Sequence, residues 1–191
     1  FFDDFSLRIP LNFAKHEADL MFDIPKAFEG SLRFEDYAGP PVLDLTLRRT
    51  AEHIRNSIPQ SSKLLVVHAD TGRPKMWPAA RFTRTLDLFL DSHPEFLVML
   101  VGTNPQPIDA GRNSQHVIPC YGLPLGAAVS LTGLADLFLG VDSCMLHAAD
   151  LYRVPAVGLF GASSALEYGF RFTPSSIVVE GRIIPRPPAL R

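Results

Sequence analysis

Polar side chains gather between two apolar runs late in the chain, in the stretch VDSCMLHAADLYRVPAVGLFG at residues 141–161. Asp142 and Ser143 suit a helix N-cap, and the next three amide groups would then be free at the helix start. Such a helix start attracts phosphate through its unpaired N–H donors and its dipole. His147 follows Ser143 by four positions, so the spacing predicts that it reaches the same ligand.

A second polar loop, HADTGRPKMWP at residues 68–78, supplies a cation. Lys75 lies in this loop, with Thr71 and the backbone around Gly72 beside it. A lysine, a hydroxyl group and a helix start at one edge of a sheet would suit a diphosphate. Each loop alone has an ordinary structural explanation, because Asp-Ser commonly caps helices and loop lysines commonly face solvent. The pairing of the two loops therefore carries the prediction of a phosphate site.

Alternating strand and helix patterns from Lys63 onward must position these loops. Apolar runs predict strands at 63–69, 96–102, 116–120, 135–141, 155–161 and 175–181. Amphipathic or apolar patterns predict helices at 77–93, 124–134 and 143–153. This alternation indicates a parallel sheet covered on both faces. Ligands of such sheets bind at the carboxyl ends of the strands, where both polar loops are expected.

The two ends of the chain follow a different pattern. Residues 1–60 are predicted to be irregular, apart from an amphipathic helix within 43–58. Within this part, the stretches FFDDFSLRIP and FDIPKAF are short apolar fragments interrupted by proline. The tail at 181–191 is rich in proline and is predicted to be extended.

Composition excludes several classes of protein. The formal net charge is −2 and no stretch is densely basic, which disfavours a nucleic-acid partner. No apolar run reaches the length of about 18–20 residues that spans a bilayer. Two cysteines cannot form a disulfide framework and lack zinc-site spacing, so neither a metal nor a cofactor is predicted. Glycine-rich dinucleotide and P-loop fingerprints are also missing from the sequence.

Two motifs in order give the chain a resemblance to a known family. KMWP at 75–78 matches the pattern K-x-W-P, and DSCMLHAA at 142–149 matches D-[ST]-G-x-x-H-x-x except at the glycine. From about Lys63 to about Phe172 the chain resembles the carboxyl-terminal domain of the heptosyltransferases. These are the ADP-heptose:lipopolysaccharide glycosyltransferases and their relatives, of glycosyltransferase family 9 and the GT-B type.

The resemblance implies an α/β fold, with a Rossmann-like parallel sheet flanked by helices, as the carboxyl-terminal half of a GT-B glycosyltransferase. It divides the chain into a remnant of the amino-terminal acceptor domain with its linker (1–60), a donor-binding domain (61–180) and the tail (181–191). The catalytic base is expected in the missing part of the amino-terminal domain. This chain alone is therefore expected to bind a donor without transferring its sugar.

The implied activity is inverting transfer of a heptose-like sugar from a nucleoside-diphosphate sugar donor. ADP is the nucleotide expected in that donor. The implied acceptor is a lipopolysaccharide-type or other glycan, or a lipid-linked one, in the cytoplasm or at the inner face of its membrane. Lys75 and Thr71 would contact the donor phosphates, and Leu123 would pack against the nucleobase. The implied donor-binding residues are Thr71, Lys75, Gln106, Leu123, Asp142, Ser143, Cys144, Met145 and His147.

Two departures from the family pattern leave alternatives open. Cys144 replaces the glycine of the second motif, and Gln106 or a neighbour replaces an acidic residue expected near the ribose. A catalytically incomplete module that only binds a sugar nucleotide is therefore a second hypothesis. A hydrolase that uses Cys144 or Ser143 with His147 is a third, because a helix start can lower a thiol pKa. The absence of a G-x-S-x-G motif argues against it.

Overall fold

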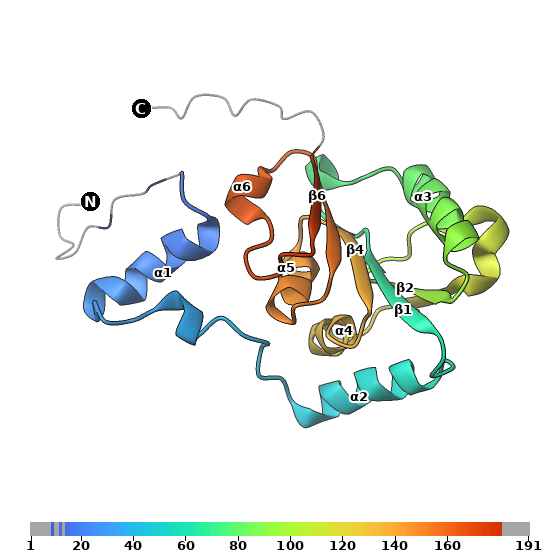
Figure 1. The fold of residues 1–191 in the computed structure, drawn as a ribbon, viewed down its shortest axis with the longest axis horizontal. Coiled ribbons are helices and arrows are strands. Elements are labelled where there is room, and N and C mark those ends of the chain that lie inside the picture. The colour runs from blue at the N-terminus through green and yellow to red at the C-terminus, as the bar shows by residue number, and fades with distance from the viewer. Residues whose placement is uncertain (1–8, 10–11, 13, 181–191) are drawn as a thin grey trace.

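A six-stranded parallel sheet organises the chain, in the strand order β3-β2-β1-β4-β5-β6 (Figure 1). The computed structural model describes residues 9, 12 and 14–180, so the tail at 181–191 and residues 1–8 lie outside the described residues. The strands are β1 (Lys63–His68), β2 (Phe96–Gly102), β3 (Val117–Tyr121), β4 (Leu137–Val141), β5 (Ala156–Phe160) and β6 (Ile177–Glu180). All of the predicted strands and the α/β fold class are thereby confirmed.

Helices cover both faces of the sheet (Figure 1). On one face lie α4 (Leu125–Thr132) and α5 (Cys144–Leu151), with α2 (Leu45–Asn56) packed against α4. On the other face lies α3 (Ala79–Ser92), beside the 3-10 helix η3 (Gly111–His116). The remaining elements are α1 (Glu17–Phe28), η1 (Phe34–Asp36), η2 (Arg73–Lys75) and α6 (Ala165–Tyr168).

The central strand β1 shows why the sheet is covered on both sides. Leu64 and Val66 belong to the apolar cluster beneath α2, α4 and α5. Leu65 and Val67, which alternate with them, belong to the cluster beneath α3. Side chains of a strand point alternately to opposite faces, so a continuous apolar run is stable only between two helix layers. Burial of these side chains on both faces stabilises the strand whose carboxyl end carries the first polar loop.

The amino-terminal part is more helical than its sequence suggests. FDIPKAF lies within the last two turns of α1, so the prediction of an irregular fragment there is wrong. Pro25 lies inside this helix, where proline normally costs stability. Tertiary contacts compensate, because Leu20 is buried and Asp19 forms an ion pair with Arg171. Sequence patterns could not show these contacts, since Arg171 lies at the other end of the chain.

Helix α2 contributes directly to the core of the sheet. Ala51 of α2 is fully buried in the same apolar cluster as Leu64 and Val66. The predicted boundary between an acceptor-domain remnant (1–60) and a donor-binding domain (61–180) stays a prediction.

In the described part of the chain, no helix combines the length and apolar character that crossing a bilayer requires.

Candidate functional site

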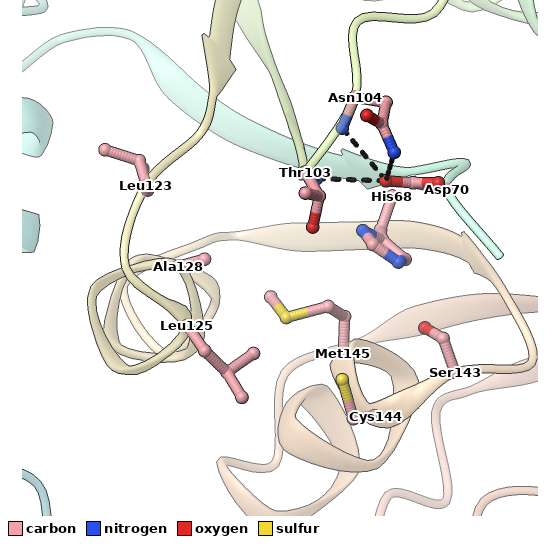
Figure 2. Close-up of a pocket in the computed structure, with 11 residues that line it drawn as sticks. His68, Asp70, Thr103, Asn104, Leu123, Leu125, Ala128, Ser143, Cys144 and Met145 are labelled. Atoms are coloured by element: carbon pink, nitrogen blue, oxygen red, sulfur yellow. Dashed lines mark hydrogen bonds between the residues drawn. The ribbon is translucent and has the colours of Figure 1, made fainter.

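A cavity of about 440 Å³ opens at the carboxyl edge of the sheet. Its lining comes from the last residues of β1 and β2 and from the segments that follow β1, β2, β3 and β4 (Figure 2). The strand order reverses between β1 and β4, and open α/β sheets bind ligands at such a reversal. The lining residues are His68, Asp70, Gly102, Thr103, Asn104, Leu123, Leu125, Ala128, Ser143, Cys144 and Met145.

One wall of the cavity is apolar and the opposite side is polar. Leu123, Leu125 and Ala128 lie together on one side in Figure 2, with the Met145 side chain between them and the polar groups. Asp70 and Ser143 lie on the other side. An apolar wall with a few polar groups facing it is the usual composition of a small-molecule site.

The start of α5 forms the floor of the polar side. Ser143 is the N-cap residue, but its side chain makes no capping hydrogen bond. Among the described residues, no hydrogen bond uses the amide groups of Cys144 and Met145, which remain free as the sequence predicted. The expectation of a third free amide is wrong, because Leu146 donates to the Ser143 carbonyl at 3.1 Å. The helix tightens in its first turn and so satisfies that group internally.

The two polar loops meet at an ion pair. Lys75 Nζ lies 2.7 Å from Oδ2 of Asp142, whose side chain is only 3% exposed, whereas that of Lys75 is 40% exposed. No other donor bonds to this oxygen in the described part of the chain. Thr71 Oγ1 also donates to the Asp142 backbone carbonyl at 3.4 Å. The loop lysine is therefore held beside the start of α5.

Aromatic contacts keep the lysine loop in place. Trp77, from the KMWP motif, packs edge-on against Phe82 of α3, with ring centroids 5.0 Å apart. Lys75 Nζ lies 5.7 Å from the centroid of the Tyr168 ring on α6. The tryptophan anchors the loop to the helix that follows, and the tyrosine face adds a weak attraction for the cation.

His147 and Gln106 do not line the cavity. Burial lowers the pKa of His147, and the nearby charges of His16 and Lys75 lower it further, against the opposing carboxylates of Asp142 and Asp150. His147 therefore lies near the ion pair and outside the lining of the cavity. Gln106 lies on the loop after β2, where its carbonyl accepts from the Tyr121 hydroxyl at 3.4 Å.

The predicted site residues thus fall into separate groups. Leu123, Ser143, Cys144 and Met145 line the cavity. Lys75 and Asp142 form the ion pair beside it, and Thr71 and His147 lie next to that pair. Cys144 is exposed and leaves the cavity open.

Sequence reasoning missed the polar residues that follow β1 and β2. His68 and Asp70 end or follow β1, and Thr103 and Asn104 follow β2. His68 Nδ1 lies 3.1 Å from the Val101 carbonyl, and burial lowers its pKa despite the opposing pull of Asp70 and two backbone carbonyls. The available signal was topological, since the ends of adjacent strands at a reversal of strand order meet at one place.

Two other kinds of chemistry find no support in the geometry. No hydrogen bond joins the side chain of Cys144 or Ser143 to that of His147 among the described residues, so the nucleophile and base of a hydrolase are not paired. Within the same residues, no group of three or more His, Cys, Asp or Glu side chains is arranged to hold a metal ion.

Comparison with known proteins identifies the family. A family model described as glycosyltransferase family 9 (heptosyltransferase) matches residues 20–184, well over half of the chain. The chain belongs to glycosyltransferase family 9. The stretches KMWP and DSCMLH, which suggested the resemblance to this family, lie on the two loops that meet at the ion pair. A search of curated proteins finds no match.

Solved structures of the family share the fold. A family 9 glycosyltransferase from Veillonella parvula has a TM-score of 0.70 and 21% identity, over 92% of this chain and 51% of its own. E. coli ADP-heptose lps heptosyltransferase II has a TM-score of 0.57 and 18% identity, over 73% and 44%. E. coli heptosyltransferase WaaC with ADP has a TM-score of 0.51 and 18% identity, over 68% and 42%. The chain spans about half the length of these relatives.

Proposed function

We propose that this chain carries the donor site of a family 9 glycosyltransferase. The enzyme would transfer a heptose-like sugar from an ADP-linked donor. The observation that carries the proposal is the Lys75–Asp142 ion pair at the start of α5, beside an open cavity with one apolar wall. Family membership supplies the reaction class. The E. coli relatives described as an ADP-heptose heptosyltransferase and as WaaC with ADP support the choice of nucleotide.

Each part of the site would perform one task in donor binding. The nucleobase would lie against Leu123 and its apolar neighbours. The diphosphate would accept hydrogen bonds from the free amide groups of Cys144 and Met145 and would be attracted by the Lys75 ammonium group. Negative charge grows on the diphosphate as the sugar leaves, so these groups would stabilise the transition state more than the bound donor.

The remaining features of the proposal concern the whole enzyme. Transfer would be inverting, to a lipopolysaccharide-type or other glycan acceptor, in the cytoplasm or at the inner face of its membrane. Residues 61–180 would bind the donor, residues 1–60 would continue an acceptor domain, and that domain would supply the catalytic base. His147, beside the ion pair, and Gln106, on the loop after β2, would complete the donor site.

Nucleotide binding tests the proposal directly. Calorimetric titration with ADP, UDP, GDP and CDP should show binding of ADP, and ADP should raise the melting temperature. Lys75→Met should weaken ADP binding about 10- to 100-fold, because it removes a charged donor to phosphate. Lys63→Met is the matched control, since Lys63 also pairs with a carboxylate but lies at the opposite end of β1. Failure of every nucleoside diphosphate to bind would refute the donor site.

A sugar-nucleotide-binding module without transferase activity is the second candidate function. It is favoured by the ion pair itself, because Asp142 already neutralises the lysine charge that a leaving diphosphate requires. An assay for sugar release from ADP-heptose, with a chain that includes a full acceptor domain, separates the two functions. Binding without release to any acceptor would favour the module.

A further inference from the structure

We infer that His68 takes up a proton when the donor diphosphate binds and then donates a hydrogen bond to it from Nε2. This inference rests on the proposed function, because it concerns the same cavity. His68 ends β1 and lines that cavity, although neither sequence motif indicated it. Donor binding would weaken as the pH rises, since it would need a proton that becomes scarcer.

The His68 ring is fixed at one nitrogen and open at the other. Nδ1 lies 3.1 Å from the Val101 carbonyl, which can only accept, so Nδ1 carries the proton of the neutral ring. Among the described residues, no hydrogen bond uses Nε2, and Nε2 is not one of the enclosed unpaired polar atoms. His68 is otherwise 92% buried, and its open side is the cavity. In Figure 2 the ring projects from β1 toward Ser143 and Met145 at the start of α5.

The cavity lacks the positive charge that a diphosphate needs. In the described part of the chain, its lining contains neither lysine nor arginine, and Asp70 adds a negative charge. Lys75, just outside the lining, is already paired with Asp142. These fixed charges leave one negative charge beside an anionic ligand. His68 is the lining residue that can become a cation near neutral pH.

A neutral His68 ring would face the diphosphate with a lone pair on Nε2. That lone pair and a phosphate oxygen are both acceptors, so they repel each other. Protonation turns Nε2 into an N–H donor and gives a charge-assisted hydrogen bond to the phosphate. The proton comes from the buffer, bonds to Nε2, and returns to the buffer when the nucleotide leaves.

The surroundings of the ring allow this change of charge. Burial lowers the pKa of His68 in the free chain, whereas the Asp70 carboxylate and the carbonyls of Val101 and Asp70 oppose that effect. The charge of a nearby anion commonly raises a histidine pKa by about 1–3 units, in the direction that the inference requires.

Few other titratable groups lie around the cavity. They are the Cys144 thiol at the start of α5 and, on β3, the Tyr121 hydroxyl, which the Asp70 charge also affects. His147 and the ion pair lie outside the lining. The loops after β2 and β3 and helix α4 add only uncharged side chains, from Thr103, Asn104, Leu123, Leu125 and Ala128.

Calorimetric titration with ADP-heptose, in buffers of different ionisation enthalpy at one pH, counts the protons taken up. The terminal phosphate of free ADP titrates near pH 6, and the ester bond to the sugar removes that titration. We expect about 0.5–1 proton per nucleotide at pH 7, and an affinity about 3- to 10-fold lower at pH 8. Binding without proton uptake would overturn the inference and leave the proposed function intact. No binding of ADP-heptose or of ADP would overturn both.

His68→Asn identifies the residue responsible. The asparagine amide nitrogen can replace Nδ1 as donor to the Val101 carbonyl, but no atom remains at the place of Nε2. Proton uptake should disappear, and ADP-heptose should bind about 10- to 100-fold more weakly at pH 7.

His147→Asn is the matched control. His147 is also largely buried, with its pKa lowered by burial, but it lies by the ion pair and outside the lining. This variant should keep the proton uptake, whatever its affinity. Uptake that persists in a folded His68→Asn protein, or that is lost only in His147→Asn, would refute the role of His68.

Discussion

The ion pair between Lys75 and Asp142 should contribute to stability as well as to binding. Lys75→Met replaces the apolar stem of the side chain by one of similar length but leaves the Asp142 carboxylate without its partner. The carboxylate is almost fully buried, at 3% exposure, so it cannot turn to water to recover solvation. We therefore expect Lys75→Met to destabilise the chain and Lys75→Met/Asp142→Asn to recover most of the loss.

The size of the effect follows from distance and exposure. At the observed 2.7 Å, two unit charges attract by about 1.5 kcal/mol in water and about 6 kcal/mol at an effective dielectric constant of about 20. The 40% exposure of Lys75 lets solvent screen the pair, and both ions lose hydration on pairing. A net loss of about 1–2 kcal/mol is expected for the single substitution. This corresponds to a melting temperature lower by about 2–8 °C for a chain of this size.

Urea unfolding followed by circular dichroism measures the interaction energy between Lys75 and Asp142 in a double-mutant cycle. The wild type, Lys75→Met, Asp142→Asn and the double variant provide the free energies of unfolding, and their combination isolates the pairwise energy. A coupling energy of about 1–2 kcal/mol is expected. A single variant as stable as the wild type, or a double variant no more stable than Lys75→Met, would refute the reasoning.

Other regions of the molecule provide independent tests. Iodoacetamide should modify exposed Cys144 before Cys120, whose pKa is raised by burial, and ADP should slow the reaction at Cys144; faster labelling of Cys120 by peptide mass analysis would contradict this. Gly133→Ala should lower the free energy of unfolding by about 1–3 kcal/mol, because its Cβ would lie 2.6 Å from the Tyr152 ring; unchanged urea unfolding would contradict that packing. Burial lowers the pKa of His68 below its ordinary 6.5, so stability should be full above pH 6.5 and fall as the pH drops through the lowered value. His68→Gln should flatten that slope in urea unfolding measured between pH 5 and 8, and an unchanged slope would contradict the assignment.

Local patterns predicted most of the sheet because its strands are continuous apolar runs between turn residues. The stretch KLLVVH, for example, became β1, and SSIVVEG contained β6. The helix α1 was missed because Pro25 is a strong local signal against a helix, whereas the contacts that offset it come from residues as distant as Gly169 and Arg171. Distant contacts of this kind override the local preference against a helix, and the residues around Pro25 do not reveal them.

The residues of the candidate site also divide into those that local sequence patterns predict and those that they do not. The motifs indicated Lys75 and Asp142 because their residue types and order are characteristic, and the fold places them 2.7 Å apart. Asp70 could not be chosen from the sequence, since nothing in HADTGRPK shows that the amide groups after β2 would turn toward its carboxylate.

The sequence by itself determined the class of fold, the strands, and the two loops for which we propose phosphate binding, because periodicity and residue type are local properties. Only the tertiary structure decided which side chains share the cavity and which surround the ion pair. It also decided that the loop lysine already has a partner and that a carboxylate faces the apolar wall. The physical reason is that distances between strand ends depend on strand order, and burial depends on the helices packed around them.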